Sequence, residues 1–329
     1  KIGHPCFHGQ LTLSLFIFRS QIIFIPFPAC LRRALLARAL CGYAGKRPRH
    51  IRQRKIPGDD AVALLPLAND RVGATVVAMV TPDGQADRGR LLLAAVLVAA
   101  SATLLVLNGG GVPTSITLAL VGASSGAGFA GGQPNWHLVL RVLGIAVLSP
   151  LAAFAISRTI YLLTHSRTPR SSTTMVFLGF LLTCLAYGSN DGQKMIAMFS
   201  AAIGTDLDTA THNGAITATV TAAFLAGVLT GMPKGATALQ RGTIVPDSRQ
   251  TWVTLWAASL AVLISSMLGS PVSMTQSISG ALIGTCQTND WRKVRWGEAR
   301  RILIAWAATL PMAWILGYAA ANGLDLLPL

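Results

Sequence analysis

Seven consecutive residues, Gly188 to Lys194, place a carboxylate, an ammonium and two carboxamides inside an otherwise apolar stretch. The apolar flanks, Met175–Tyr187 and Met195–Gly204, are each shorter than the ~20 residues of a spanning helix, but together they are long enough. This polar island, residues 188–194, is therefore predicted to lie at membrane depth, where polar groups are costly and mark a functional site. The alternative is a polar loop between two short buried helices of a soluble protein.

The side chains of the polar island define the chemistry it could perform. Asn190 and Asp191 offer oxygens suited to Na⁺, and the carboxylate of Asp191 could instead carry a proton. Gln193 adds two donors and an acceptor, and Lys194 adds a fixed cation. Because Lys194 follows Asp191 by three positions, a helix would bring the two side chains together. Lys194 is thus either a structural partner of Asp191 or a direct ligand.

Two pairs of hydroxyl groups follow prolines elsewhere in the chain, Ser115 with Thr117 and Ser273 with Thr275. If a half-helix begins at each pair, backbone N–H groups and hydroxyls converge on its positive end and form a site for an oxyanion. The alternative is ordinary helix N-capping.

The two hydroxyl pairs belong to an internal repeat. The segment Gly111–Ala123 aligns with Gly269–Ala281, and one Asn-Asp pair lies upstream of each copy, Asn69-Asp70 and Asn190-Asp191. Paired interrupted apolar segments are typical of secondary transporters, whose site lies where the repeats meet. The alternative is a duplicated bundle kept for packing, in which small residues allow close helix approach.

Composition places the whole chain in a membrane. Of 329 residues, 52% are hydrophobic and 12% are charged, with a mean hydropathy of +0.54, against about 25% charged residues in soluble domains. The net charge of +15 comes from cations at segment ends and in short loops, such as Arg292–Arg301. This is the pattern of cytoplasmic loops, so nucleic acid is not the expected partner and the lipid bilayer is.

The predicted fold is an all-α polytopic membrane protein with roughly 8–10 membrane segments. We expect two repeats, inverted relative to each other, at about residues 60–163 and 174–329 of a membrane domain 56–329. The polar island should break its helix, Asn69-Asp70 should mark an unwound point, and Thr114–Gly132 and Val272–Gly284 should form re-entrant hairpins. Continuous helices are expected at the segments Leu91–Val106, Leu138–Leu163, Trp252–Leu268 and Ile302–Ala321.

Residues 1–55 differ from the rest, because an interrupted apolar stretch is followed by a strongly basic one. They resemble no cleavable signal peptide. They are either a divergent first membrane segment with a basic tail or sequence outside the functional core.

The cysteines and histidines indicate neither disulfides nor a metal centre. The five cysteines contain no CxxC pair and the six histidines no ligand spacing. No pairing of nucleophile and base is visible, so an enzyme is not expected. No cofactor is expected either, apart from a coupling cation, Na⁺ or H⁺. The sequence allows a homo-oligomer.

At the polar motifs the chain resembles the inorganic phosphate transporter (PiT) family, as a divergent member. Gly188–Lys194 is similar to the family's second Gly-Ala-Asn-Asp-Ala-Gln-Lys motif, and Pro271–Gln276 to its second Pro-Val-Ser-Thr-Thr-His motif. Pro113–Leu118 resembles the first proline motif, and Leu67–Ala74 a degraded first Asn-Asp motif. The resemblance covers about residues 60–325.

This resemblance implies symport of inorganic phosphate with Na⁺ or H⁺ across the inner (plasma) membrane. The coupling ion would be handled by Asn69, Asp70, Asn190 and Asp191. The oxyanion would be bound by Ser115, Thr117, Ser273 and Thr275, assisted by Gln193 and Lys194.

The motifs depart from the family pattern at several positions. Leu118 and Gln276 replace the two motif histidines, Gly73 replaces an asparagine, and Arg71 adds a charge beside Asp70. Without these histidines, proton coupling would fall on Asp70 or Asp191. The alternatives are transport of another oxyanion such as sulfate, or a membrane protein that has lost transport.

Overall fold

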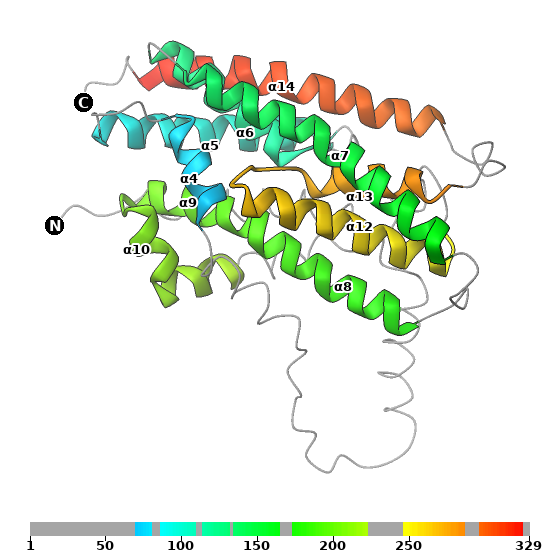
Figure 1. Cartoon of the computed structure of the whole chain (residues 1–329). Coiled ribbons are helices and arrows are strands. Elements are labelled where there is room, and N and C mark those ends of the chain that lie inside the picture. The colour runs from blue at the N-terminus through cyan, green and yellow to red at the C-terminus, as the bar shows by residue number, and fades with distance from the viewer. Residues whose placement is uncertain are drawn as a thin grey trace, which may run out of the picture.

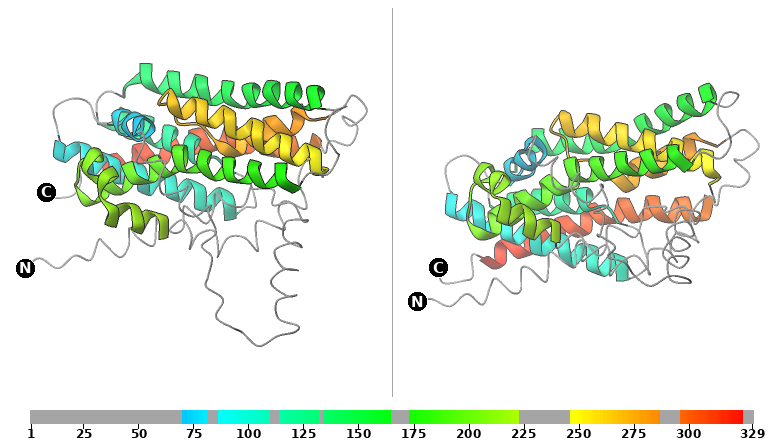
Figure 2. Two further views of the ribbon diagram at one scale, coloured as in Figure 1. Left: turned by 60° about the horizontal axis from the view of Figure 1, so that its bottom comes forward. Right: turned by 90° about the horizontal axis from the view of Figure 1, so that it is seen from below.

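The computed structural model describes residues 70–80, 86–109, 114–131, 134–164, 173–222, 246–286 and 296–324. Every regular element within these ranges is a helix, which confirms the predicted all-helical class. The atypical segment 1–55 and Asn69 lie outside the described residues. The long helices run roughly side by side in all three ribbon views (Figures 1 and 2).

The polar island does not break its helix. Helix α8 (Thr173–Tyr187) continues through a π-helical turn, η3 (Gly188–Gly192), into α9 (Gln193–Ile203), and Figure 1 shows one continuous rod. The prediction of a broken helix was wrong at this point. A π turn accommodates an extra residue while its backbone groups stay hydrogen-bonded, and such turns are frequent at functional sites.

Six further helices of the described part of the chain, three from each half, pack beside this rod or against one another. All four predicted continuous segments lie within or nearly within them. Their bounds are α5 (Ala86–Gly109), α6 (Ile116–Ala130), α7 (Trp136–Thr164), α12 (Ser248–Met267), α13 (Met274–Gly284) and α14 (Trp296–Leu324).

The shorter helix of each half packs against the long C-terminal helix of the other half. Helix α6 lies against α14, and α13 lies against α7. The contacts are close enough to require glycine: a Cβ on Gly122 would lie 2.5 Å from the Leu310 carbonyl oxygen, and one on Gly280 would lie 2.2 Å from that of Pro150. The same contact is therefore made twice.

These contacts correct the expectation of two re-entrant hairpins. Within the described residues, 114–131 and 272–284 each contain one helix, α6 of 15 residues and α13 of 11 residues. Their glycines do not reverse the chain but let two backbones approach closely, as small residues do in membrane helix pairs.

Within the described residues, three helices are long and apolar enough to cross a membrane, namely Trp136–Thr164, Ser248–Met267 and Leu303–Leu324, and two shorter apolar helices accompany them. Ser248–Met267 is 72% buried, whereas the other two are 28% and 22% buried. Helices α7 and α14 thus present apolar side chains outward, as a lipid-facing surface does, and the chain is a membrane protein. The predicted total of roughly 8–10 segments stays a prediction.

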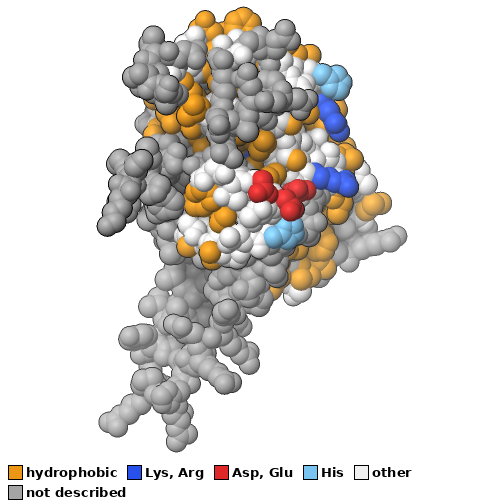
Figure 3. All heavy atoms as spheres, turned by 90° about the vertical axis from the view of Figure 1, so that its left-hand side faces the viewer, with side chains coloured by type: hydrophobic (Ala, Val, Ile, Leu, Met, Phe, Trp, Pro, Cys, Tyr) orange, Lys and Arg blue, Asp and Glu red, His pale blue; other side chains and the backbone are white. Residues whose placement is uncertain are grey.

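Short helices close one end of the molecule. Helix α4 (Arg71–Ala78) packs on α9, and α10 (Leu207–His212) follows α9. The face at the left of Figure 1 carries acidic, basic and histidine side chains among apolar ones (Figure 3). On this exposed end, the Thr209 backbone N–H donates to Asp206 and lowers the pKa of its carboxyl.

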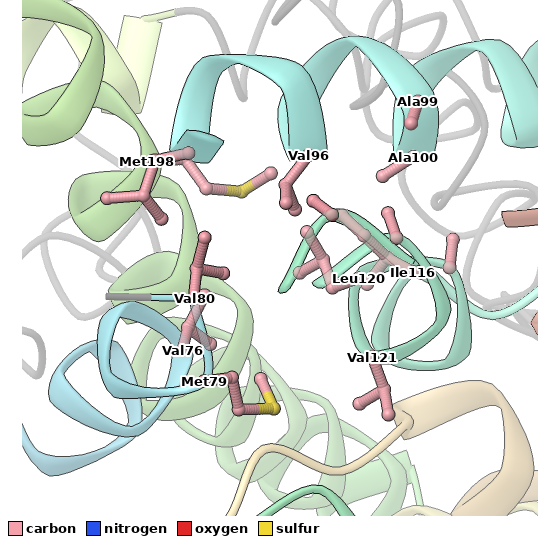
Figure 4. Packing of buried hydrophobic residues seen from close by; sticks show 14 of the residues in the cluster. Val76, Met79, Val80, Val96, Ala99, Ala100, Ile116, Leu120, Val121 and Met198 are labelled. Carbon is pink, nitrogen blue, oxygen red and sulfur yellow. The ribbon is translucent and has the colours of Figure 1, made fainter. Parts of the chain in front are cut away.

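Part of the apolar core joins α4, α5, α6 and α9. Val76, Val96, Leu120 and Met198, one from each helix, point toward one another (Figure 4). All are buried. This packing fixes the N-terminus of α6 and the first turns of α9 in the same region, which is where the polar side chains gather.

Candidate functional site

Lys194 is the centre of the buried polar cluster. Its side chain has 0% exposure, and its ammonium donates to Asp191 Oδ1 at 2.8 Å, Thr117 Oγ1 at 2.9 Å and the Val272 carbonyl oxygen at 2.7 Å. The Thr117 hydroxyl in turn donates to the same carbonyl at 2.8 Å. All three protons of the ammonium are therefore used within the protein.

Lys194 lies about one helical turn after Asp191. Asp191 lies within η3 and Lys194 is the second residue of α9, so the i, i+3 spacing brings the two side chains together as the sequence predicted. Both are buried. A buried ion pair of this kind is held by its additional hydrogen bonds, here those from Lys194 to Thr117 and Val272.

Two helix N-termini meet beside this ion pair. Helix α6 begins after Ser115 and α13 begins after Ser273, so the predicted half-helix starts are confirmed at both hydroxyl pairs. The bond from Thr117 in the first turn of α6 to the Val272 carbonyl just before α13 joins the two starts directly. Backbone N–H groups and the positive ends of two helix dipoles thus converge on one region.

The remaining hydroxyls of the two pairs are also buried. Ser115 Oγ accepts from the Leu118 N–H at 3.3 Å, which is the N-capping contact given above as the alternative. Ser273 makes no such contact, and its hydroxyl lies 2.8 Å from that of Thr275. The two pairs are therefore used differently.

Asn190 carries a buried oxygen without a partner in the described part of the chain. Its amide nitrogen donates to Ser266 Oγ at 3.0 Å and to the Ser270 carbonyl oxygen at 3.5 Å. The Ser266 hydroxyl itself donates to the Val262 carbonyl. Because Ser266 Oγ must accept from Asn190, the free atom is Oδ1, an oxygen that could bind a cation.

In Gln193, the amide nitrogen and not the oxygen is without a hydrogen-bond partner in the described residues. Its Oε1 accepts from the Val72 N–H at 2.9 Å, so this side chain caps the first turn of α4 from another helix. Its Nε2 is buried and makes no hydrogen bond in the described ranges. A buried unpaired donor costs about 1–3 kcal/mol, which a bound anion would offset.

Asp70, the described member of the first Asn-Asp pair, does not join the cluster. Asp70 is exposed and its side chain does not cap α4, and Asn69 lies outside the described residues. Arg71 instead donates to the Met267 carbonyl oxygen at 3.1 Å. A Cβ on Gly73 would already lie 3.2 Å from the Gln193 carbonyl oxygen, so the asparagine of the family motif would not fit here without a shift of α9.

Sequence reasoning missed several contributors to the site. The Val272 carbonyl has no signature in a sequence, because every residue carries one. Ser266 lies in the last turn of α12 and Ser270 just after that helix, and a lone serine in either place does not indicate a binding site. Gln276, noted above as a lost histidine, has a buried Oε1 with no partner in the described residues.

The assembled site offers both kinds of partner. The N–H groups at the two helix starts can receive an oxyanion, while Asn190 Oδ1 beside Asp191 can hold a monovalent cation. Gln193, whose side chain contacts α4, adds an unused buried donor, Nε2. Among the described residues, the structure brings Asn190, Asp191, Gln193, Lys194 and Thr117 into one buried region, with Ser115, Ser273 and Thr275 at the adjoining helix starts.

Comparisons with known proteins point to one family. The sequence profile described as "Phosphate transporter family" matches residues 65–182 and 166–317. Similar curated proteins include two named probable low-affinity inorganic phosphate transporters. The one from Bacillus subtilis (strain 168) is 26% identical over 70% of this chain and 74% of its own length. The one from Rhizobium meliloti (strain 1021) is 27% identical over 63% and 66%.

A relative of the same name from Mycobacterium leprae (strain TN) is 28% identical over 63% of this chain, and the match spans about half of its length, 54%. Among solved structures, one titled "The sodium-dependent phosphate transporter" superposes with a TM-score of 0.61 at 18% identity. It covers 96% of this chain and 99% of its own. At this identity the likeness shows a shared fold.

Proposed function

Because the chain belongs to the phosphate transporter family, we propose that it carries inorganic phosphate across the membrane. The observation that carries this proposal is the meeting of the α6 and α13 N-termini at the Thr117–Val272 contact. Neither helix has an acidic residue in its first turn, and the nearby Asp191 carboxylate is neutralised by Lys194. The region is therefore favourable for an anion.

The architecture of the proposal is two repeats, inverted relative to each other, within a membrane domain 56–329. The reciprocal packing of α6 on α14 and of α13 on α7 supports the repeats at residues 60–163 and 174–329, because equivalent glycines, Gly122 and Gly280, make both contacts. The substrate would bind where the halves meet.

Phosphate would be bound by hydroxyls and by one amide. Ser115 and Thr117 from the first half and Ser273 and Thr275 from the second are buried at the two helix starts. The unpaired Nε2 of Gln193 would donate to a phosphate oxygen. Lys194 would act by positioning Asp191 and Thr117, since its three protons are already used.

The proposed coupling ion is Na⁺, bound at Asn190 Oδ1 and Asp191, with the plasma membrane as the site of transport. The free oxygen of Asn190 supports a metal cation over a proton. The sodium-dependent transporter that shares the fold points the same way. The exposed Asp70 would have to approach the site in another conformation to take part, and Asn69, the other proposed ligand of that pair, lies outside the described residues.

The test is uptake of radiolabelled phosphate into proteoliposomes, under a Na⁺ gradient and a proton gradient applied separately. We expect uptake under the Na⁺ gradient and none for Asp191→Asn. Uptake under the proton gradient alone would show that the coupling ion is H⁺ and not Na⁺. Unchanged uptake by Asp191→Asn would contradict the role of this carboxylate.

The same vesicles decide between the remaining alternatives. Excess sulfate should leave phosphate uptake unchanged, and strong competition would make the protein a carrier of another oxyanion. If folded protein transports neither anion under either gradient, the chain has lost transport.

A further inference from the structure

The surroundings of the Lys194 ammonium are those of a cation-binding site. Nζ is enclosed by a carboxylate, a hydroxyl and a backbone carbonyl, from Asp191, Thr117 and Val272, at 2.7 to 2.9 Å. These three oxygen types are the ligands that hard metal cations take in proteins. The three oxygens come from three segments, so whatever cation fills the site also ties those segments together.

We propose that Lys194 acts as a tethered cation, whose ammonium occupies an oxygen-lined site and keeps a free monovalent cation out of it. Since the ammonium supplies the positive charge beside Asp191 Oδ1, this oxygen-lined site needs no ion from solution, and the proposed Na⁺ would bind next to it, at Asn190 Oδ1 and the second oxygen of Asp191. The buried, fully hydrogen-bonded state of Lys194 carries the argument. To bind an anion directly, the ammonium would need a fourth N–H, but it has three and all three are already hydrogen-bonded.

The other half of the chain lacks the tethered charge. When the two Asn-Asp pairs are aligned, Gly73 takes the place of Lys194. Thr275, the counterpart of Thr117, has its hydroxyl against that of Ser273 rather than against an ammonium. The second motif therefore carries a buried positive charge, whereas the positive charge of the first motif, on Arg71, is exposed.

Removing the ammonium gives the proposal a measurable consequence. Without it, the Asp191 carboxylate would be buried and unpaired, which is strongly destabilising unless another cation enters. Lys194→Ala also leaves room for that cation. A ligand that binds the folded state raises its stability in proportion to the logarithm of concentration, so Na⁺ or K⁺ should stabilise this variant more than the unsubstituted protein.

The experiment measures the thermal midpoint of the full-length protein in detergent, in NaCl, KCl and choline chloride at equal ionic strength. For Lys194→Ala we expect NaCl or KCl to raise the midpoint over choline by ~3 °C or more beyond the shift of the unsubstituted protein. The matched control, Asp191→Asn/Lys194→Ala, removes both charges and should lose this excess.

Each outcome decides the proposal. An equal salt response of Lys194→Ala and the unsubstituted protein would overturn it. If Lys194→Ala folds in NaCl or KCl but not in choline, the proposal holds. Failure to fold in all three salts, while the double variant folds, would show that no free cation replaces the ammonium and would also overturn it.

The inference deepens the proposed function and rests on it for its meaning in transport. Its readout does not involve phosphate, so the two can fail separately. A cation-dependent midpoint without phosphate uptake would leave the tethered cation intact and reject the transport proposal. Phosphate uptake without the excess salt response would do the reverse.

Discussion

At the scale of single residues, the Thr117 hydroxyl joins the two halves of the chain. It accepts from Lys194 and donates to the Val272 carbonyl, so one oxygen links α9, α6 and the start of α13. A threonine that only capped its own helix would not reach another half of the chain. Its hydroxyl therefore stabilises the contact between the two halves and is also a candidate ligand for phosphate.

Thr117→Val should destabilise the protein, because it keeps the shape of the side chain but removes an acceptor from a buried ammonium. We expect a loss of about 1–3 kcal/mol, measured as a lower thermal midpoint in detergent. Thr117→Ser retains the oxygen and serves as the matched control. Equal midpoints for Thr117→Val and Thr117→Ser would show that the hydroxyl does not stabilise this contact.

The two amide atoms of Gln193 have different roles, because the oxygen caps α4 and the nitrogen is the donor proposed for phosphate. In Gln193→Glu, an oxygen still accepts from the Val72 N–H, while the donor is replaced by a buried carboxylate oxygen. We expect the KM for phosphate uptake to rise on the order of tenfold or more, and the midpoint to fall because the new carboxylate is buried without a cation of its own. Gln193→Met removes both atoms and should lower the midpoint as well.

An unchanged KM in Gln193→Glu would remove this side chain from the phosphate site. In that case, the buried Nε2 would need another partner.

At the scale of elements, two glycine contacts set how closely the halves approach. Gly280→Ala should destabilise, since the new Cβ would lie 2.2 Å from the Pro150 carbonyl oxygen and overpacking of this kind costs about 1–3 kcal/mol. Gly144→Ala is the matched control within α7, where nothing lies within 4 Å of the added Cβ. It should be neutral or gain about 0.5–1 kcal/mol.

Thermal unfolding of the two alanine variants in the same detergent tests this contact. Equal midpoints would mean that α13 and α7 are not held at the distance seen here.

The π turn is the second feature at the scale of elements that shapes the site. It places Asp191, Asn190 and Gln193 around a helix that stays continuous, so the polar groups face neighbouring helices without an exposed backbone. Unpaired backbone groups at membrane depth cost several kcal/mol each. A widened turn thus meets the same need for which an unwound helix was predicted.

At the scale of the whole molecule, the outer faces of α7 and α14 should contact lipid. Val147 is 64% exposed and Ile315 60% exposed, although both are apolar. In a variant whose five cysteines are replaced by alanine, we expect Val147→Cys to resist a membrane-impermeant maleimide in vesicles and to react with a lipid-soluble one. Asp208→Cys, at a position 82% exposed on α10, should react with both in opened vesicles.

Reaction of Val147→Cys with the impermeant reagent would place this face of α7 in water. It would then indicate a water-filled cavity or a protein interface instead of lipid.

Much of the site could be predicted from residue types alone. The Asp191–Lys194 contact follows from a three-residue spacing on a helix, and the starts of α6 and α13 follow from hydroxyl residues placed just after prolines. The glycine-rich segments misled the prediction, because glycine serves both a chain reversal and a close helix contact. Neighbouring residues do not distinguish these two uses.

The sequence by itself determined the membrane class, the family motifs, the helix starts and the ion pair, because these depend on composition and on residues a few positions apart. Tertiary structure decided the rest. It placed the Val272 carbonyl from one half against Thr117 from the other, used all three protons of Lys194, and left Asn190 Oδ1 and Gln193 Nε2 without partners. Such contacts join residues far apart in the chain, and a backbone carbonyl has no residue type from which it could be predicted.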